Sequence, residues 1–130
     1  MNKQDYYDLL VVSAFDGTFP SIDENGLCLY RGPNGTKCGV GILIPDDIYL
    51  PNIEGEGVRF ICEKYDIIPK NMTPMDIIIV QGYHDRTAKY AEFDFIQKFL
   101  SLINNDLRIF DDVIKIKGCP EELLTVPSEL

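Results

Sequence analysis

The residues best suited to chemistry are one cysteine, the single histidine of the chain and the aspartate that follows it. Cys38 lies in a glycine-rich segment, and His84-Asp85 stands at the end of a predicted helix. A cysteine beside a histidine that an acid orients is the arrangement of a nucleophilic hydrolase. The chain has no nucleophile-elbow motif, and residues adjacent in sequence seldom orient one another. Cys38, His84 and Asp85 are therefore candidate catalytic residues. The sequence as a whole favours a protein that is not an enzyme.

Structural roles are the alternative for these residues. A histidine near a helix C-terminus complements the helix dipole and can bond the last carbonyl groups. The chain has four cysteines, and these are Cys28, Cys38, Cys62 and Cys119. In a cytosolic protein they are expected to be reduced thiols that pack as small hydrophobic side chains. Because there is no C-x-x-C pair and only one histidine, the sequence predicts neither a metal site nor a cofactor.

A second group of charged residues follows the glycine-rich segment closely enough to form a binding site. Its members are Arg31, Asp46, Asp47, Glu54 and Glu56. The acids could ligate a cation, but their spacing differs from that of an EF-hand loop. A solvated acidic rim is the preferred interpretation. Arg31 and its neighbouring glycines could hold an anion, although no P-loop motif is present.

Composition and charge limit the classes of function. The chain has 130 residues, of which 45% are hydrophobic, and this fits one domain with a real core. Its 21 acidic and 12 basic side chains give a net charge of −9. That charge disfavours direct binding to nucleic acid and to anionic membrane surfaces, since both depend on lysine and arginine. It is compatible with a basic protein partner, or with a surface that imitates nucleic acid.

No segment predicts export or membrane insertion. The N-terminus lacks the basic region and apolar stretch of a signal peptide. No apolar run approaches the about 20 residues that a membrane-spanning helix needs. We therefore expect a cytoplasmic protein.

Hydrophobic periodicity and capping signals predict several helices. Helices are expected over residues 5–14, 58–65 and 89–104, the last with a continuous apolar stripe. The dipeptide Thr73-Pro74 opens a further helix, because threonine favours the N-cap and proline the first turn. The residues of this helix expected to face inward are Met75, Ile78, Ile79, Gly82 and Tyr83. A strand across residues 77–80 is the alternative, because this run is rich in β-branched residues.

A β-hairpin is predicted between the first two helices. Residues 26–31 and 36–44 form the strands, and Pro33 and Gly35 occupy the second and fourth positions of a type I turn. Gly39 and Gly41 leave one face of the return strand bare. Something must therefore pack closely against that face.

Together these elements predict a small α+β domain. The β-hairpin, with a third strand from residues 113–116 as an option, would be packed by about four helices, on which a two-stranded hairpin depends. The compact domain is expected to cover residues 1–118. Residues 119–130 follow as an acidic C-terminal tail.

The hairpin segment also carries a family resemblance. The segment CLYRGPNGTKCGVGILIPDDIY, from Cys28 to Tyr49, is followed by Glu54-Gly55 and by the motif Q-x-x-H-D that ends at Asp85. With these motifs, the chain resembles a family of small uncharacterised proteins found mainly in phage genomes, prophages and other mobile elements of bacteria. The match covers residues 30–99.

The departures from the family pattern are mild. The family often has alanine or isoleucine at the position of Gly39, and leucine at that of Val80. The resemblance implies a setting, a phage-type accessory gene expressed in the cytoplasm of a bacterial host cell. It implies no reaction mechanism.

These observations favour a phage-type accessory protein that acts by binding. It would inhibit a host defence protein, in the manner of an anti-CRISPR protein, or a nucleic-acid-processing protein, through an acidic surface. The partner would be a host protein with a basic surface, and a homodimer is compatible with the sequence. The alternative is a small-ligand-binding protein or hydrolase with a pocket around Arg31, Cys38 and His84. In a third interpretation the motif only folds the chain, and function lies on other surfaces.

Overall fold

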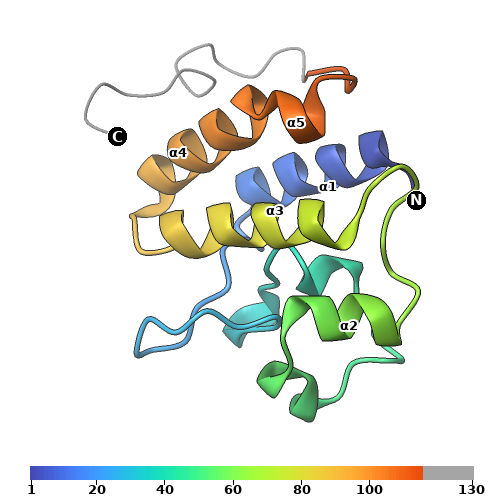
Figure 1. Cartoon of the computed structure of the whole chain (residues 1–130). Coiled ribbons are helices and arrows are strands. Elements are labelled where there is room, and N and C mark those ends of the chain that lie inside the picture. Colours follow the sequence, from blue (N-terminus) through green and yellow to red (C-terminus); the bar gives the residue numbers. More distant parts are fainter. Residues whose placement is uncertain (116–130) are drawn as a thin grey trace.

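A helical fold is seen in the computed structural model, which describes residues 1–115 (Figure 1). The helices are α1 (Lys3–Asp16), α2 (Val58–Lys64), α3 (Pro74–Thr87), α4 (Glu92–Asn105) and α5 (Leu107–Phe110). Three short 3-10 helices lie between α1 and α2, and these are η1 (Pro33–Gly35), η2 (Gly41–Leu43) and η3 (Pro51–Gly55). The predicted tail 119–130, with Cys119, and the end of the optional third strand lie outside the described residues.

The prediction of an α+β domain with a β-hairpin is wrong, because residues 1–115 contain no β-strand. The chain does reverse here, with the Gly32 amide donating to the Thr36 carbonyl at 2.9 Å, but Asn34 at the third position has φ 61°, so the turn is not the predicted type I turn. Pairing beside it stops after the single bridge between Arg31 and Lys37. Beyond Cys38 the chain coils into η2 instead of continuing as a strand. A reversal of the chain was therefore not enough to extend two paired strands.

Gly41 explains why the chain turns at this point. A Cβ atom added to Gly41 would lie 1.8 Å from the carbonyl oxygen of Tyr30, so only glycine fits. At Gly39 an added Cβ would lie 3.3 Å from a methyl group of Val80 on α3. The expectation that something packs closely against the two glycines is confirmed. Their neighbours are the Tyr30 backbone and α3, and the contact is made by a coiled segment.

Local capping signals place the long helices. A capping box of Asn2 and Asp5 begins α1, and Gly17 ends it with a left-handed backbone at φ 83°. Thr73 and Asp76 form a second capping box at α3, which confirms the predicted start and excludes the strand alternative there. Among the described residues, no helix is long and apolar enough to span a bilayer.

Helix α3 lies at the centre of the fold, between α4 on one side and α2 with the irregular segment on the other (Figure 1). The apolar stripe of α4 was predicted correctly, and Phe95 and Phe99 on it are fully or almost fully buried. Both rings pack against Phe19, at centroid distances of 5.6 and 5.0 Å. The buried face of α3 includes Gln81 and His84, whereas Ile78 and Ile79 are only partly buried.

We predict that Gly41→Ala lowers the free energy of unfolding by about 3 kcal/mol, because overpacking against a backbone carbonyl cannot be relieved by a side-chain rotation. Gly82→Ala on α3 is the matched control, since nothing lies within 4 Å of its added Cβ. The control should gain about 0.5–1 kcal/mol from the higher helix propensity of alanine. Urea unfolding followed by circular dichroism measures both, and equal stabilities would contradict the close contact.

Candidate functional site

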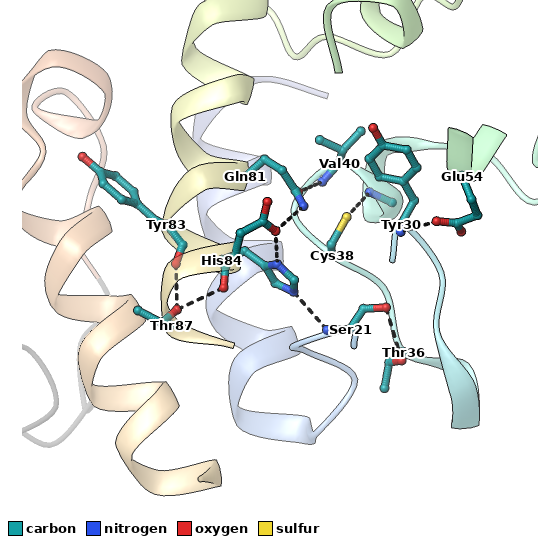
Figure 2. A network of polar contacts seen from close by, with 12 residues as sticks. Ser21, Tyr30, Thr36, Cys38, Val40, Glu54, Gln81, Tyr83, His84 and Thr87 are labelled. Carbon is teal, nitrogen blue, oxygen red and sulfur yellow. Dashed lines mark hydrogen bonds and ion pairs between the residues drawn. The ribbon is translucent and has the colours of Figure 1, made fainter. Parts of the chain in front are cut away.

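The candidate site is a polar network between α3 and the irregular segment that precedes α2 (Figure 2). Helix α3 contributes Gln81, His84 and Asp85, within one turn of each other. The irregular segment contributes backbone amides. Those of Ser21 and Val40 donate hydrogen bonds to side chains of α3. The network therefore joins a regular element to one that lacks a hydrogen-bonded ladder of its own.

His84 is completely buried, and both of its ring nitrogens are occupied. Its Nε2 accepts a hydrogen bond of 2.9 Å from the Ser21 backbone amide. Because Nε2 must offer a lone pair to this amide, the ring proton lies on Nδ1, which donates to the Asp85 carboxylate over 3.0 Å. The Phe19 ring packs edge-on against the imidazole at 5.0 Å. The imidazole thus has no free nitrogen for a substrate.

Asp85 collects the hydrogen bonds of the network. The same Oδ1 that accepts from His84 also accepts from Gln81 Nε2 at 2.9 Å. The Gln81 amide oxygen in turn accepts from the Val40 backbone amide at 3.1 Å. Burial alone would raise the pKa of Asp85, but hydrogen bonds from His84, Cys28 and Gln81 outweigh it and leave that pKa lowered. The carboxylate is therefore held in its charged form.

Cys38 is fully buried and lies apart from the histidine. Its Sγ accepts a hydrogen bond from the Gly41 amide at 3.3 Å. Burial raises the pKa of the Cys38 thiol to about 12, although hydrogen bonds from neighbouring backbone amides act in the opposite direction. Within the part of the chain that the structure describes, no hydrogen bond joins Cys38 to His84. This geometry does not supply the activated pair that a cysteine hydrolase needs.

Cys28, Asp85 and His84 bring three potential metal ligands together. One ligand atom from each lies within 4.8 Å of the other two. Coordination by His84 Nδ1 would move the ring proton to Nε2, where it would face the Ser21 amide hydrogen. A metal at this nitrogen would therefore break the hydrogen bond that holds Ser21. The cluster as it stands is built for internal hydrogen bonding.

Glu54 and Arg31 were predicted as binding residues, and the structure commits both to internal contacts. The Glu54 carboxylate accepts from the Tyr30 and Arg31 backbone amides at 2.8 and 3.0 Å, and from the Tyr49 hydroxyl at 2.6 Å. The Arg31 guanidinium donates to the Ile44 carbonyl. These two side chains hold the start of the turn against the loop that leads to α2.

The other three predicted binding residues lie nearer the solvent. The Asp46 side chain is 82% exposed and forms ion pairs with Arg31 at 2.8 Å and Lys37 at 3.6 Å. Asp47 is exposed, and Glu56 is half-buried. Only part of the predicted acidic rim is therefore available to a partner.

A small cavity of about 150 Å³ opens beside the network. It is lined by Cys28, Leu29, Tyr30, Glu54, Val58, Gln81 and Asp85. The predicted pocket was to surround Arg31, Cys38 and His84, and none of these three lines the cavity. Its volume is below the roughly 300 Å³ at which pockets for drug-sized ligands begin. It has room for a small polar ligand.

Sequence reasoning missed Ser21 and the part played by Gln81. Gln81 and His84 are three residues apart on one helix, and this spacing places both side chains on the same face. A glutamine and a histidine on an otherwise apolar helix face were the available signal. The contact of Ser21 with His84 is made by its backbone amide, which no residue type reveals.

Comparison with known protein families, curated proteins and solved structures finds no match for this chain. The resemblance to the phage-type family therefore stays a prediction.

We predict that long-range ¹H–¹⁵N NMR spectra find the His84 proton on Nδ1, because Nε2 accepts from Ser21. The Ser21 amide should exchange slowly with solvent. His84→Leu removes this acceptor and should lower the free energy of unfolding by about 2–3 kcal/mol, the cost of a buried unpaired amide together with the lost Asp85 bond. A proton on Nε2 in the native protein would contradict the assigned network.

We also predict slow alkylation of Cys28 by iodoacetamide, although the residue is exposed. Partial burial raises its thiol pKa to about 12, with a hydrogen bond and negative charge from Asp85 adding to the shift. Below that pH the reactive thiolate is scarce, and the rate should climb as the pH rises.

Asp85→Asn removes the charge beside Cys28 and should speed its alkylation several-fold at constant pH. Asp94→Asn, which changes an exposed acid on α4, is the control and should leave the rate unchanged. Mass spectrometry of the alkylated peptide gives the rate at Cys28. Equal rates in the two variants would show that Asp85 does not act on this thiol.

Proposed function

We propose that this protein acts by binding another protein and not by catalysis. The observation that carries the proposal is that the candidate nucleophile Cys38 and the candidate base His84 are both used inside the fold. The Cys38 thiol is buried and protonated, and both nitrogens of His84 hold other parts of the fold. A nucleophile or general base needs access to substrate, which neither residue has.

The partner in this proposal is a host protein with a basic surface. A net charge of −9 favours association with a basic partner and repels nucleic acid. The resemblance to phage-type proteins supports a bacterial host defence or nucleic-acid-processing protein as the target. In this role the protein would inhibit by occupying the surface that its target uses for nucleic acid.

Helix α1 offers the best surface for such a partner. Its outer side carries the exposed acids Asp5, Asp8 and Asp16. Between them lie two exposed apolar side chains, Val12 at 55% and Phe15 at 43% of their full exposure. Acidic residues around an apolar centre match the usual anatomy of a protein interface. We call these five residues the α1 acidic face.

A small-ligand-binding protein is the second candidate, and the 150 Å³ cavity is the observation that favours it. The carboxylates of Glu54 and Asp85 both line this cavity. They would favour a small ligand that is cationic or rich in hydrogen-bond donors. This ligand would be bound without a chemical step.

The test is affinity capture of tagged protein from bacterial lysate, with the retained proteins identified by mass spectrometry. A double variant, Asp8→Lys with Val12→Ser, alters the α1 acidic face without touching its capping box. Glu63→Lys, which reverses an exposed charge on α2, is the matched control. We expect a stoichiometric partner that the control retains, that the double variant loses, and that dissociates at high salt.

Two outcomes would contradict the proposal. A partner retained equally by the double variant would exclude the α1 acidic face. Absence of any retained protein at low salt would count against binding to a host protein. In that case calorimetric screening of small cations and amines against native protein and Glu54→Gln would test the cavity instead.

A further inference from the structure

A cavity of about 270 Å³ opens beside the C-terminal half of α1. Helix α1 contributes Leu9, Ser13 and Asp16 to its lining, and the irregular segment contributes Thr18, Lys37 and Ile42. The two parts of the lining are joined where the Lys37 backbone amide donates to the Thr18 carbonyl at 3.0 Å. The cavity is separate from the polar network around His84, because no residue of that network lines it.

The Ser13 hydroxyl is a polar group that the fold does not use. Ser13 is only 5% exposed, and it lines the cavity. Its hydroxyl has no hydrogen-bond partner in the part of the chain that the structure describes. Buried polar side chains are as a rule hydrogen-bonded. The hydroxyl therefore favours an occupant with a polar group.

Asp16 brings a carboxylate to the same cavity. Its Oδ1 accepts from the Thr18 backbone amide at 3.0 Å and from the Thr18 hydroxyl at 2.7 Å. These two bonds hold the carboxylate at the end of α1. Among the described residues, Oδ2 has no hydrogen bond and Asp16 has no ion pair. A positioned carboxylate with one free oxygen suits a cationic donor.

The charges around the cavity also favour a cation. Residues 8–47, which contain the whole lining, carry six acidic and two basic side chains. The two basic side chains are Arg31 and Lys37, and both pair with Asp46, at 2.8 and 3.6 Å. Lys37 lines the cavity, but its charge is directed to Asp46 and not to Asp16. The charge of Asp16 is therefore left for an occupant.

The cavity continues the α1 acidic face. Asp8, Val12 and Asp16 recur every four residues and follow one stripe of α1. Leu9 and Ser13, each one residue further along, follow the neighbouring stripe and line the cavity. Asp16 belongs to both the face and the cavity. A partner on the face can therefore reach the cavity with one extended side chain.

We propose, on the basis of the binding function proposed above, that this cavity receives one lysine or arginine side chain of the basic partner. Its alkyl stem lies against Leu9, and its charged group donates to Asp16 and to the Ser13 hydroxyl. Long cationic side chains suit such a site, because they place their stems along apolar surface and their charged ends on polar groups. Side chains that fill pockets carry much of the energy of an interface. This side chain is thus the anchor of the partner.

An uncharged apolar side chain is the competing occupant. Leu9 and Ile42 would accept it equally well. It would, however, cover the Ser13 hydroxyl and the free oxygen of Asp16 without giving either a hydrogen bond, which is unfavourable. The charge of the occupant therefore distinguishes the two cases.

Titration followed by ¹H–¹⁵N NMR tests the cavity without any host protein. The probe is Nα-acetyl-lysine methylamide. The control ligand is Nα-acetyl-norleucine methylamide, which has the same alkyl stem without the ammonium group. The lysine probe should shift the backbone amide signals of Ser13, Thr18 and Lys37. It should bind about tenfold more tightly than the norleucine control, because hydrogen bonds between charged groups are the stronger ones.

Two variants test the residues that hold the cation. Asp16→Asn keeps a side-chain oxygen for Thr18 but removes the charge, and should weaken binding of the lysine probe about tenfold. Ser13→Ala removes the hydroxyl and should weaken it about threefold. Glu63→Gln, which removes an exposed negative charge on α2, is the matched control and should change affinity less than about twofold. Circular dichroism verifies that each variant is folded.

Three results would overturn the proposal: no shift of the three amide signals, equal affinity for the lysine and norleucine ligands, or equal affinity of Asp16→Asn and Glu63→Gln for the lysine probe. If the titration fails but affinity capture yields a partner that the α1 double variant loses, only the assignment of the cavity is overturned. A selective titration without a captured partner would instead overturn the host-protein partner and leave the cation site standing.

Discussion

The fold depends on buried backbone amides that have no partner in a helix or sheet. Between α1 and α2 the chain forms only short 3-10 helices and single bridges. Several of its amides donate to carbonyls of the same segment, but those of Ser21 and Val40 need acceptors from elsewhere. Helix α3 supplies them through Gln81, which accepts from Val40, and His84, which accepts from Ser21. An apolar helix face could bury this segment but could not satisfy its hydrogen bonds. The polar face of α3 therefore decides where the segment lies.

The same constraint explains the other polar residues of the motif. The Tyr6 hydroxyl donates to the Gly39 carbonyl at 2.5 Å, and Glu54 accepts from two consecutive amides at the turn. Buried polar groups stabilise a fold only when their partners are all present. Gly41 must remain bare for the backbone of Tyr30 to reach this position. The contacts of the motif thus depend on one another, because the loss of one group leaves its buried partners without a hydrogen bond.

These contacts show what the sequence could reveal and what it could not. The apolar stripe of α4 and the capping residues of α3 were predicted, because their signals are local. The β-hairpin prediction was wrong. The flanking residues are β-prone and the chain reverses where expected, but residues 41–43 form a 3-10 helix, and the close contact between Gly41 and Tyr30 that accompanies it is a tertiary contact that local sequence does not reveal. Ile78 and Ile79 were expected to face inward and are only partly buried, with Ile79 packed against the core. Hydrophobicity favoured them, whereas the hydrogen-bond needs of a distant segment placed Gln81 and His84 there.

The candidate site shows that residue type alone does not predict the role of a side chain. Cysteine, histidine and aspartate were recognised as the residues able to do chemistry, yet their roles depend on which atoms are free. His84 Nε2, which accepts from the Ser21 amide, is the nitrogen that a general base would use. His84 therefore cannot hold Ser21 and act as a general base at the same time. Because the motif residues hold the chain together, recognition in the proposed function depends on side chains outside the motif. For the proposed protein partner these are Asp8, Val12 and Phe15 on the outer side of α1, where Asp8 can be changed without removing a helix cap.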